Sequence, residues 1–232
     1  MTSEQYKGIF FDAGNTLLRV YPSIGELYSS TARDFGVDWP PQEIEQTFRD
    51  LWAKTAPLVD NDGHRLSYQR ERDWWKFIVR EVFGDRIGKD NFDAFFDELY
   101  ERFEDMNSWR LYDDVLEVLQ QLKDRGQVLA IISNWDSRLP SLLQSLGLAP
   151  FFKATVVSAL VGYEKPHPAI FQIALKDTNL QPHEVLYIGD DPFLDYQAAQ
   201  KAGMDALHLD RSGHYKPHPG RITSLTEILV SH

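Results

Sequence analysis

The chain has 232 residues, 43% hydrophobic and 25% charged, which is typical of a globular protein with one large domain or a core plus an insertion. Its net charge is −11, so no overall positive field attracts nucleic acid or an anionic membrane surface. The absence of cysteine excludes disulfides, a thiolate nucleophile, iron–sulfur clusters and cysteine-ligated zinc.

The N-terminal segment MTSEQYKGIFF has neither the basic start nor the long apolar stretch of a secretory signal. No apolar run approaches the roughly 18 residues that a membrane span needs. We therefore expect a soluble cytoplasmic protein, a monomer or homodimer, that binds neither nucleic acid nor membrane.

The first predicted element is a buried strand in GIFFDAGNTLL, residues 8–18, where an apolar run ends at Asp12. Four amphipathic helices are predicted next, because apolar residues recur at helical spacing along each of them. Pro41 suits a helix start and Gly84 a helix end. The four apolar stripes are Ile24, Leu27, Tyr28, Ala32 and Phe35; Ile44, Phe48, Leu51 and Trp52; Trp74, Ile78 and Val82; and Phe92, Phe95, Phe96, Leu99 and Phe103.

Predicted strands and helices alternate in the second half of the chain. Leucines at helical spacing predict a helix that ends at Gly126. A buried strand at Val128–Ile132 follows it. Helical segments then separate the apolar run ATVVSALV, the strand VLYIGD and the short strand ALHLD, and SLTEILV is predicted as a closing helix. This alternation favours an α/β fold with a doubly wound parallel sheet.

The interval between the first two strands is too long for a simple crossover. Asp12 and Ser133 are 121 positions apart, whereas a strand–helix–strand unit needs only about 30 residues. The surplus coincides with the four helical stripes. We therefore expect an all-helical cap domain at residues 21–105, inserted into an α/β core formed by residues 1–20 and 106–232.

Polar residues of the kinds that catalyse reactions or bind ligands follow the predicted strands. Asp12, Ser133 and Asp190 each come directly after an apolar run, so they belong at the carboxyl edge of the sheet, where ligands bind in open parallel sheets. Lys165 and Asp195 lie in nearby loops. Taken singly, each residue is weak evidence, because such residues usually belong to a turn, a helix cap or a solvated surface. Together they supply a nucleophile, a hydroxyl, a cation and further carboxylates at one edge.

Four stretches, FFDAGNTLL, AIISN, GYEKPHPAIF and YIGDDPFLD, resemble in order and spacing the four motifs of the haloacid dehalogenase superfamily of aspartate-nucleophile hydrolases. Within it, DWWKFIV, ISNWDSRL and IGDDPFLDYQ resemble the rhythmically-expressed-gene-2-like branch. The resemblance implies a Rossmann-like core with an inserted helical cap. It also implies a Mg²⁺-dependent phosphatase that acts on a small phosphorylated metabolite through an aspartyl phosphate.

The resemblance also assigns roles to individual residues. Asp12 is the nucleophile, and Lys165 neutralises both Asp12 and a phosphoryl oxygen. Ser133 and the Asn134 backbone bind other phosphoryl oxygens.

Mg²⁺ suits a site built only from oxygen ligands. By the same resemblance its ligands are the Asp12 carboxylate, the backbone carbonyl of Gly14 and Asp190. Asp195 orients a metal-bound water or Lys165. Asp191 could be a metal ligand or a helix N-cap, and we favour the cap or a role that supports the ligands without binding the metal.

Gly14 departs from the family pattern. In the family's phosphatases the residue two after the nucleophile is usually a second Asp, which protonates the leaving alcohol and then deprotonates the attacking water. Glycine can do neither, although its carbonyl can still bind Mg²⁺. General acid–base catalysis is typically worth about 10²- to 10⁴-fold in rate.

Three interpretations remain open. The first is a slow or specialised phosphatase whose acid comes from the substrate, from water or from the cap. Asp60, Asp62 and His64 are the candidates in the cap, although their turn is more typical of a solvated loop. The second is a 2-haloacid dehalogenase, in which Asp12 attacks carbon. The acidic stretch GDDPFLD argues against it, because that reaction needs no Mg²⁺. The third is a non-catalytic binding protein that retains the fold.

Overall fold

The structure is a computed structural model, and it describes residues 2–229. The described chain divides into two compact units. The first comprises residues 2–19, 59–65 and 111–229, and the second comprises residues 20–58 and 66–110. Within residues 2–229, no helix is both long enough and apolar enough to cross a membrane.

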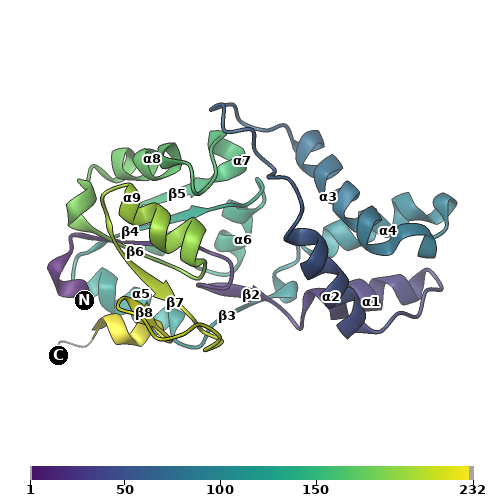
Figure 1. Cartoon of the computed structure of the whole chain (residues 1–232), viewed down its shortest axis with the longest axis horizontal. Coiled ribbons are helices and arrows are strands. Elements are labelled where there is room, and N and C mark those ends of the chain that lie inside the picture. The colour runs from purple at the N-terminus through teal and green to yellow at the C-terminus, as the bar shows by residue number, and fades with distance from the viewer. Residues whose placement is uncertain (1, 230–232) are drawn as a thin grey trace. The chain divides into compact units, whose positions relative to one another are not determined.

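Six strands form the sheet of the first unit, in the order β5-β4-β1-β6-β7-β8 (Figure 1). Every neighbouring pair is parallel. The central strand β1 is buried along its whole length, which explains its continuous apolar run. The strands are β1 (Gly8–Phe11), β4 (Val128–Ser133), β5 (Ala154–Val157), β6 (Val185–Gly189), β7 (Asp205–Leu209) and β8 (Arg221–Ile222).

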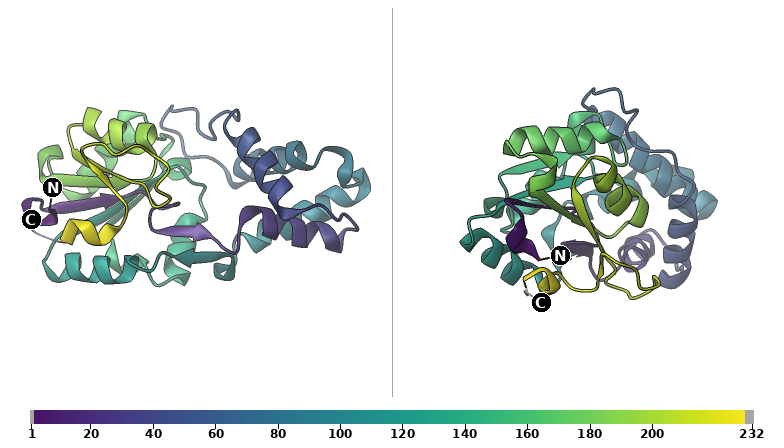
Figure 2. Two further views of the ribbon diagram at one scale, coloured as in Figure 1. Left: turned by 60° about the horizontal axis from the view of Figure 1, so that its bottom comes forward. Right: turned by 60° about the vertical axis from the view of Figure 1, so that its left-hand side comes forward.

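Helices lie on both faces of this sheet, as Figure 2 shows, so the predicted doubly wound parallel α/β fold is confirmed. On one face, Phe10 of β1 and Tyr187 of β6 pack with Phe171 and Ala199 from two of the helices. Alternation along the strands turns the neighbouring residues of β1 to the other face. The helices of this unit are α5 (Val115–Asp124), α6 (Leu139–Ser145), α7 (Ser158–Val161), α8 (Pro168–Thr178) and α9 (Ala198–Lys201).

Two predicted helices of the first unit differ in detail. The helix expected before Gly203 begins as a wide π-type turn at Pro192–Gln197 and becomes regular only in α9. The closing helix expected at SLTEILV is a 3₁₀ segment at Leu225–Leu229, and the last residue of that stretch lies outside the described residues.

The second unit consists of four helices around an aromatic core. Tyr28, Phe48, Phe83 and Phe95 are buried in it, and the rings of Phe83 and Phe95 meet edge to face with centroids 4.7 Å apart. Aromatic pairs of this kind stabilise a core beyond the area they bury. The helices are α1 (Ile24–Asp34), α2 (Pro41–Trp52), α3 (Tyr68–Phe83) and α4 (Lys89–Arg102), and they match the four predicted apolar stripes.

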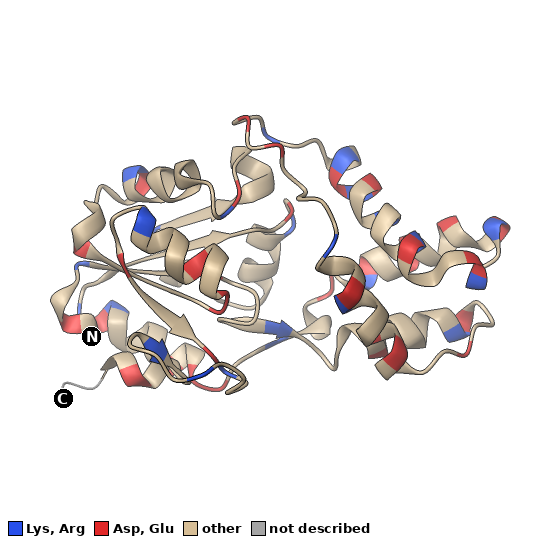
Figure 3. Ribbon diagram, viewed as in Figure 1, with Lys and Arg blue, Asp and Glu red and all other residues tan. Residues whose placement is uncertain are grey.

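Local signals fix where these helices begin. Ser23 and Ser67 accept hydrogen bonds from the backbone N–H groups of Glu26 and Arg70, which caps α1 and α3. Pro41 begins α2, as predicted. A two-stranded sheet of β2 (Leu18–Val20) and β3 (Trp109–Leu111) lies where the chain enters and leaves this unit. Acidic and basic residues are interspersed along the helices of both units (Figure 3).

Residues 59–65 belong to the first unit, although the sequence prediction placed them inside the cap interval 21–105. Gly63 N donates to Gly162 O at 3.1 Å, and Glu164 N donates to the Asn61 side chain at 2.8 Å. Gly162 has a φ of +71°, and a Cβ atom there would lie 2.2 Å from His64 N. Only glycine lets the two backbones approach so closely. Polar hydrogen bonds from the backbone and from Asn61, which leave no apolar periodicity in the sequence, therefore hold this segment.

Candidate active site

Three of the predicted site residues stand at the carboxyl edge of the sheet. Asp12 follows β1, Ser133 ends β4 and Asp190 follows β6. Because β4 and β6 flank β1 in parallel register, these three side chains reach the same edge. Lys165 joins them from the loop between α7 and α8, and Asp195 from the π-type turn Pro192–Gln197; both are buried.

Asp12 and Lys165 form a buried ion pair. Lys165 Nζ donates to Asp12 Oδ1 and to Asp195 Oδ1, both at 2.6 Å, and Ser133 Oγ donates to Asp12 Oδ1 at 3.0 Å. The Lys165 side chain is only 3% exposed. Burial alone would lower the pKa of Lys165, but the two carboxylates raise it above its ordinary value, so the group is a permanent cation.

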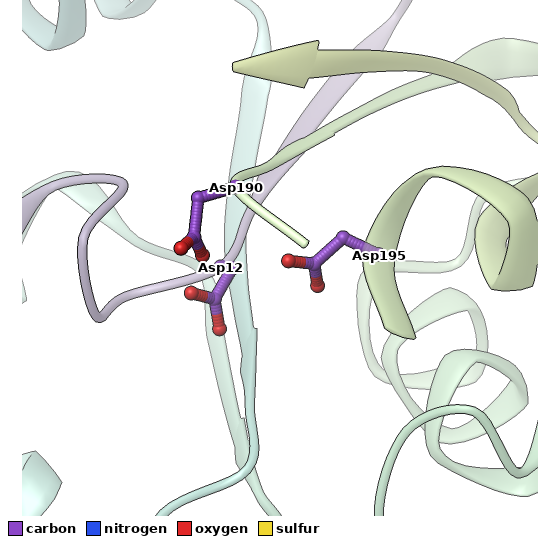
Figure 4. Close-up of side chains that lie close together, drawn as sticks. All are labelled: Asp12, Asp190 and Asp195. Carbon is purple, nitrogen blue, oxygen red and sulfur yellow. The ribbon is translucent and has the colours of Figure 1, made fainter. Parts of the chain in front are cut away.

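Three carboxylates converge around this cation. One oxygen each from Asp12, Asp190 and Asp195 lies within 4.8 Å of the others, and Figure 4 shows the three side chains pointing toward one another. Burial raises the pKa of Asp190 to about 8, with further contributions from the negative charges of Asp12 and Asp195. Burial raises the pKa of Asp12 to about 6, although Lys165 partly offsets the shift.

Asp12 and Asp190 fit a divalent cation. Three carboxylates against one ammonium leave an excess of negative charge, and the raised pKa values show that the protein alone does not compensate it. Carboxylate oxygens are the donors that Mg²⁺ prefers. Asp195 is less suited to be a ligand. Its Oδ1 accepts from Lys165 and its Oδ2 accepts from Asp191 N at 3.0 Å.

Asn134 clamps the backbone of Lys165. The Asn134 side chain accepts a hydrogen bond from Lys165 N at 2.7 Å and donates one to Lys165 O at 2.9 Å. On the preceding residue, Glu164 N is bound to the Asn61 side chain. The sequence assigned only the Asn134 backbone to the site. Its side chain adds a second task, which is to fix where the ammonium group emerges.

Asp191 caps the turn that carries Asp195. Its Oδ1 accepts from the backbone N–H groups of Phe193 and Leu194, both at 2.7 Å. A Cβ atom on Gly189 would lie 2.3 Å from Asp195 Cγ, so glycine at that position lets Asp195 approach the strand end. Of the roles that the sequence left open for Asp191, the structure shows helix capping.

Sequence reasoning missed Tyr187, which lies in β6 and is completely buried. Its hydroxyl accepts from Lys165 Nζ at 3.2 Å and donates to Asp195 Oδ1 at 2.9 Å, with Ile132 O a second acceptor at 3.2 Å. Burial and the charge of Asp195 raise the pKa of Tyr187 well above its usual range, so the hydroxyl stays protonated. The signal was a tyrosine three residues before Asp190 in an otherwise aliphatic strand.

Arg211 was also missed, and it holds the turn that follows Asp12. Its Nε and Nη2 donate to Thr16 O at 3.0 and 2.8 Å, while Nη1 and Nη2 bind the Asp114 carboxylate. The guanidinium also stacks on the Tyr112 ring at 3.9 Å. This fork fixes Thr16, two residues after Gly14 in the same turn.

Trp135 lies against Gly14. A Cβ atom on Gly14 would be 3.2 Å from Trp135 Cζ3, closer than most real contacts of this kind. Trp135 N donates to Ser158 Oγ at 3.0 Å, and Trp135 O accepts from the same hydroxyl and from Ala159 N. The sequence indicated Trp135 only as part of a motif, because nothing in the sequence places it beside position 14.

The three candidate acids of the predicted cap turn are exposed. The His64 side chain is 84% exposed and pairs with Asp62 at 3.2 Å, and Asp60 is also at the surface. Hydrogen bonds from His64 lower the pKa of Asp62. The carboxyl group is therefore ionised more readily and is less suited to hold the proton that a general acid donates. Among the described residues, no hydrogen bond or ion pair joins His64 or Asp62 to Asp12. A role for any of the three as the missing acid stays a prediction.

With this geometry in view, the comparisons with known proteins identify the family. A family model described as haloacid dehalogenase-like hydrolase matches residues 6–203. The chain belongs to this family. It is 33% identical over 208 residues to the human haloacid dehalogenase-like hydrolase domain-containing protein 3, covering 88% of this chain and 81% of the relative.

Two further similarities agree with this assignment. The Rhythmically expressed gene 2 protein of Drosophila melanogaster is 33% identical over 210 residues, which cover 86% of this chain and 81% of that one. The crystal structure of a HAD phosphatase from Thermococcus onnurineus superposes with a TM-score of 0.65 at 25% identity, covering 96% of this chain and 95% of that one. The chain is therefore a haloacid dehalogenase-like hydrolase with the family's fold.

We expect Lys165→Met to lower the free energy of unfolding by about 3–5 kcal/mol at pH 8 in EDTA, because it leaves Asp12 and Asp195 buried without their cation. Without that cation the pKa of Asp12 rises further, because Lys165 is the charge that lowers it. The folded state then binds protons more tightly than the unfolded state, so the loss is smaller at pH 5 than at pH 8.

Urea unfolding at both pH values measures this effect. The matched control is Lys7→Met, since the Lys7 side chain is 73% exposed and solvent screens its pair with Glu184. A Lys165→Met variant as stable as the wild type at pH 8 would contradict the role assigned to the ion pair.

Proposed function

We propose that this hydrolase is a Mg²⁺-dependent phosphatase that moves a phosphoryl group from a small phosphorylated metabolite to Asp12 and then to water. The observation that carries the proposal is the buried Asp12–Lys165–Asp195 array with Asp190 beside it. A phosphoryl group is anionic, so an anionic nucleophile can reach it only where fixed positive charge offsets the repulsion. The phosphatase among the similar solved structures supports the same activity.

Each residue of the array has a distinct task in this proposal. Asp12 attacks phosphorus through the carboxylate oxygen that does not bind Lys165 Nζ. Lys165 and the Ser133 hydroxyl, which already bind Asp12 Oδ1, stabilise the negative charge that gathers on the phosphoryl oxygens. Asn134 and Tyr187 keep Lys165 in place, and both do so before substrate binds.

Mg²⁺ would be held by the Asp12 carboxylate, the Gly14 carbonyl and Asp190. When bound, it would supply the positive charge that the three carboxylates lack and would polarise a phosphoryl oxygen. Asp195, whose two oxygens are occupied by Lys165 and Asp191 N, would orient this assembly without binding the ion.

The absence of a side chain at position 14 limits the chemistry. No carboxyl group stands there to protonate a leaving alcohol or to deprotonate the attacking water. The first step therefore favours leaving groups that are stable as anions, such as those of acyl and aryl phosphates. The second step, hydrolysis of phosphorylated Asp12, is expected to be slow.

One assay tests the proposal against the dehalogenase and the non-catalytic alternatives. The protein is incubated with 4-nitrophenyl phosphate, acetyl phosphate and 2-chloropropionate, each with Mg²⁺ or with EDTA. We expect Mg²⁺-dependent release of phosphate, preceded by a burst of about one nitrophenolate per chain because hydrolysis of the phosphorylated enzyme is the slower step.

The other outcomes are equally informative. Chloride release that survives EDTA would show a dehalogenase and overturn the proposal. No release from any of the three substrates, in a protein that still binds Mg²⁺, would favour a binding protein that has kept the fold.

A further inference from the structure

A phosphate monoester brings two chemically different ends to the Asp12 site, and the two sides of Asp12 differ to match. Lys165, Asp190 and Asp195 surround its carboxylate with charge. At position 14, in contrast, the Trp135 ring is the only group of the described chain, outside the two neighbours of Gly14, within 4 Å of where a Cβ would lie. With Mg²⁺ bound to offset the excess negative charge, the charged side would suit the phosphoryl group, whereas the apolar side suits the ester group.

Trp135 is positioned rigidly enough to shape this apolar side. It follows Ser133 by two residues, and Ser133 is itself hydrogen-bonded to Asp12. The Trp135 backbone is tied to Ser158 through both its N–H and its carbonyl. The next residue, Asp136, is 1% exposed and forms an ion pair with Arg138 at 2.7 Å. These contacts fix the backbone on both sides of Trp135 and so the point from which its side chain leaves the chain, which reduces the ordering that binding has to supply.

Resting on the proposed function, we infer that Trp135 and Gly14 together select aryl phosphates, the phosphate monoesters of phenols. Two independent properties of the pair favour the same class. An aromatic leaving group gains contact energy against the half-buried indole. A phenolate is also a stable anion, so it needs no proton from a residue at position 14. An alkyl phosphate gains neither advantage.

The proposed reaction balances without a proton donor. A bond forms between an Asp12 carboxylate oxygen and phosphorus while the bond from phosphorus to the aryl oxygen breaks, and the aryloxide leaves with the bonding electron pair. Water then attacks phosphorus, and the bond to Asp12 breaks to restore the carboxylate. One proton of that water stays on the released phosphate and the other passes to solvent.

The test is the ratio of kcat/KM for 4-nitrophenyl phosphate to kcat/KM for acetyl phosphate, which has a good leaving group but no ring. We expect Trp135→Leu to lower this ratio about 2- to 10-fold, mainly through KM for the aryl substrate, because ring–ring contact is lost. Trp135→Phe keeps an aromatic ring, so its ratio should stay close to that of the wild type. Phe151→Leu removes an aromatic side chain just before β5, at the opposite edge of the sheet, and should leave the ratio unchanged.

The possible outcomes distinguish the aryl selectivity from the proposed phosphatase activity on which it rests. If the wild type hydrolyses acetyl phosphate but Trp135→Leu does not change the ratio, the aryl selectivity is wrong and the phosphatase stands. If the wild type hydrolyses neither phosphate, the proposed function fails and this inference fails with it.

Discussion

Asp12→Asn is expected to abolish turnover, by about 10⁴-fold or more, and at the same time to make the metal-free protein more stable. The loss of turnover follows from the chemistry, because an amide cannot form the phosphorylated intermediate. The gain in stability follows from the surroundings of Asp12. Burial raises its pKa to about 6 despite the ion pair with Lys165, so the ionised side chain costs folding free energy.

The pH dependence of this gain has a definite sign. The pKa of Asp12 is higher in the folded chain than the ordinary 3.8, so folding takes up a proton between about pH 4 and pH 6 and the wild type loses stability as pH rises through that window. The amide that replaces this carboxyl group does not titrate. The variant should therefore match the wild type near pH 4 and exceed it by about 1–3 kcal/mol at pH 8 in EDTA.

Urea unfolding in EDTA at pH 4.5 and pH 8 measures the difference, and 4-nitrophenyl phosphate hydrolysis measures the activity. Asp38→Asn is the matched control, because that side chain is 91% exposed and its removal should not stabilise the protein at either pH. Adding Mg²⁺ should narrow the gap, since only the wild type keeps the full set of carboxylates for the ion. An Asp12→Asn variant that is less stable at pH 8 than the wild type would contradict this inference. It would show that the ion pair with Lys165 more than offsets the cost of burying the Asp12 charge.

The sequence predicts the composition of this site well, for a topological reason. Asp12, Ser133 and Asp190 each follow an apolar run, and in a parallel sheet all such positions lie at one edge whatever the exact register. Periodicity likewise predicts the four helices of the second unit, because each must bury one apolar stripe. These predictions needed only the order of elements and the spacing of apolar residues.

The residues that sequence reasoning missed depend on finer geometry. Tyr187 reaches Lys165 only because its strand lies next to β1 in a particular register, and an apolar count treats it as one more core residue. Trp135 faces Gly14 across two turns from neighbouring strands. Residues 59–65 join the first unit through a backbone hydrogen bond from Gly63 to Gly162 and one from Glu164 N to the Asn61 side chain, neither of which leaves an apolar pattern in the sequence. Contacts of this kind become visible only when positions far apart in the chain are placed in space.

The contact between Trp135 and Gly14 changes what restoring a carboxyl group at position 14 should achieve. Gly14 does not have a positive φ, so its backbone accepts an L-residue, but a Cβ there would lie 3.2 Å from the Trp135 ring. Gly14→Asp alone must push the ring aside by a few tenths of an ångström. We expect Gly14→Asp combined with Trp135→Ala to raise hydrolysis of an alkyl phosphate by about 10²- to 10⁴-fold, and Gly14→Asp alone to gain clearly less.

A double-mutant cycle on kcat/KM for ethyl phosphate, with circular dichroism and urea unfolding to check the fold, measures this coupling. The matched control is Gly14→Asn with Trp135→Ala, which has the same size but no proton to give, and it should gain nothing. Trp135→Ala alone should not help an alkyl substrate either, because removing the ring supplies no acid. If the folded Gly14→Asp, Trp135→Ala variant gains no more than its Asn counterpart, then proton transfer at position 14 is not what limits this hydrolase. The reason for glycine at that position would then lie in the room it leaves for Trp135.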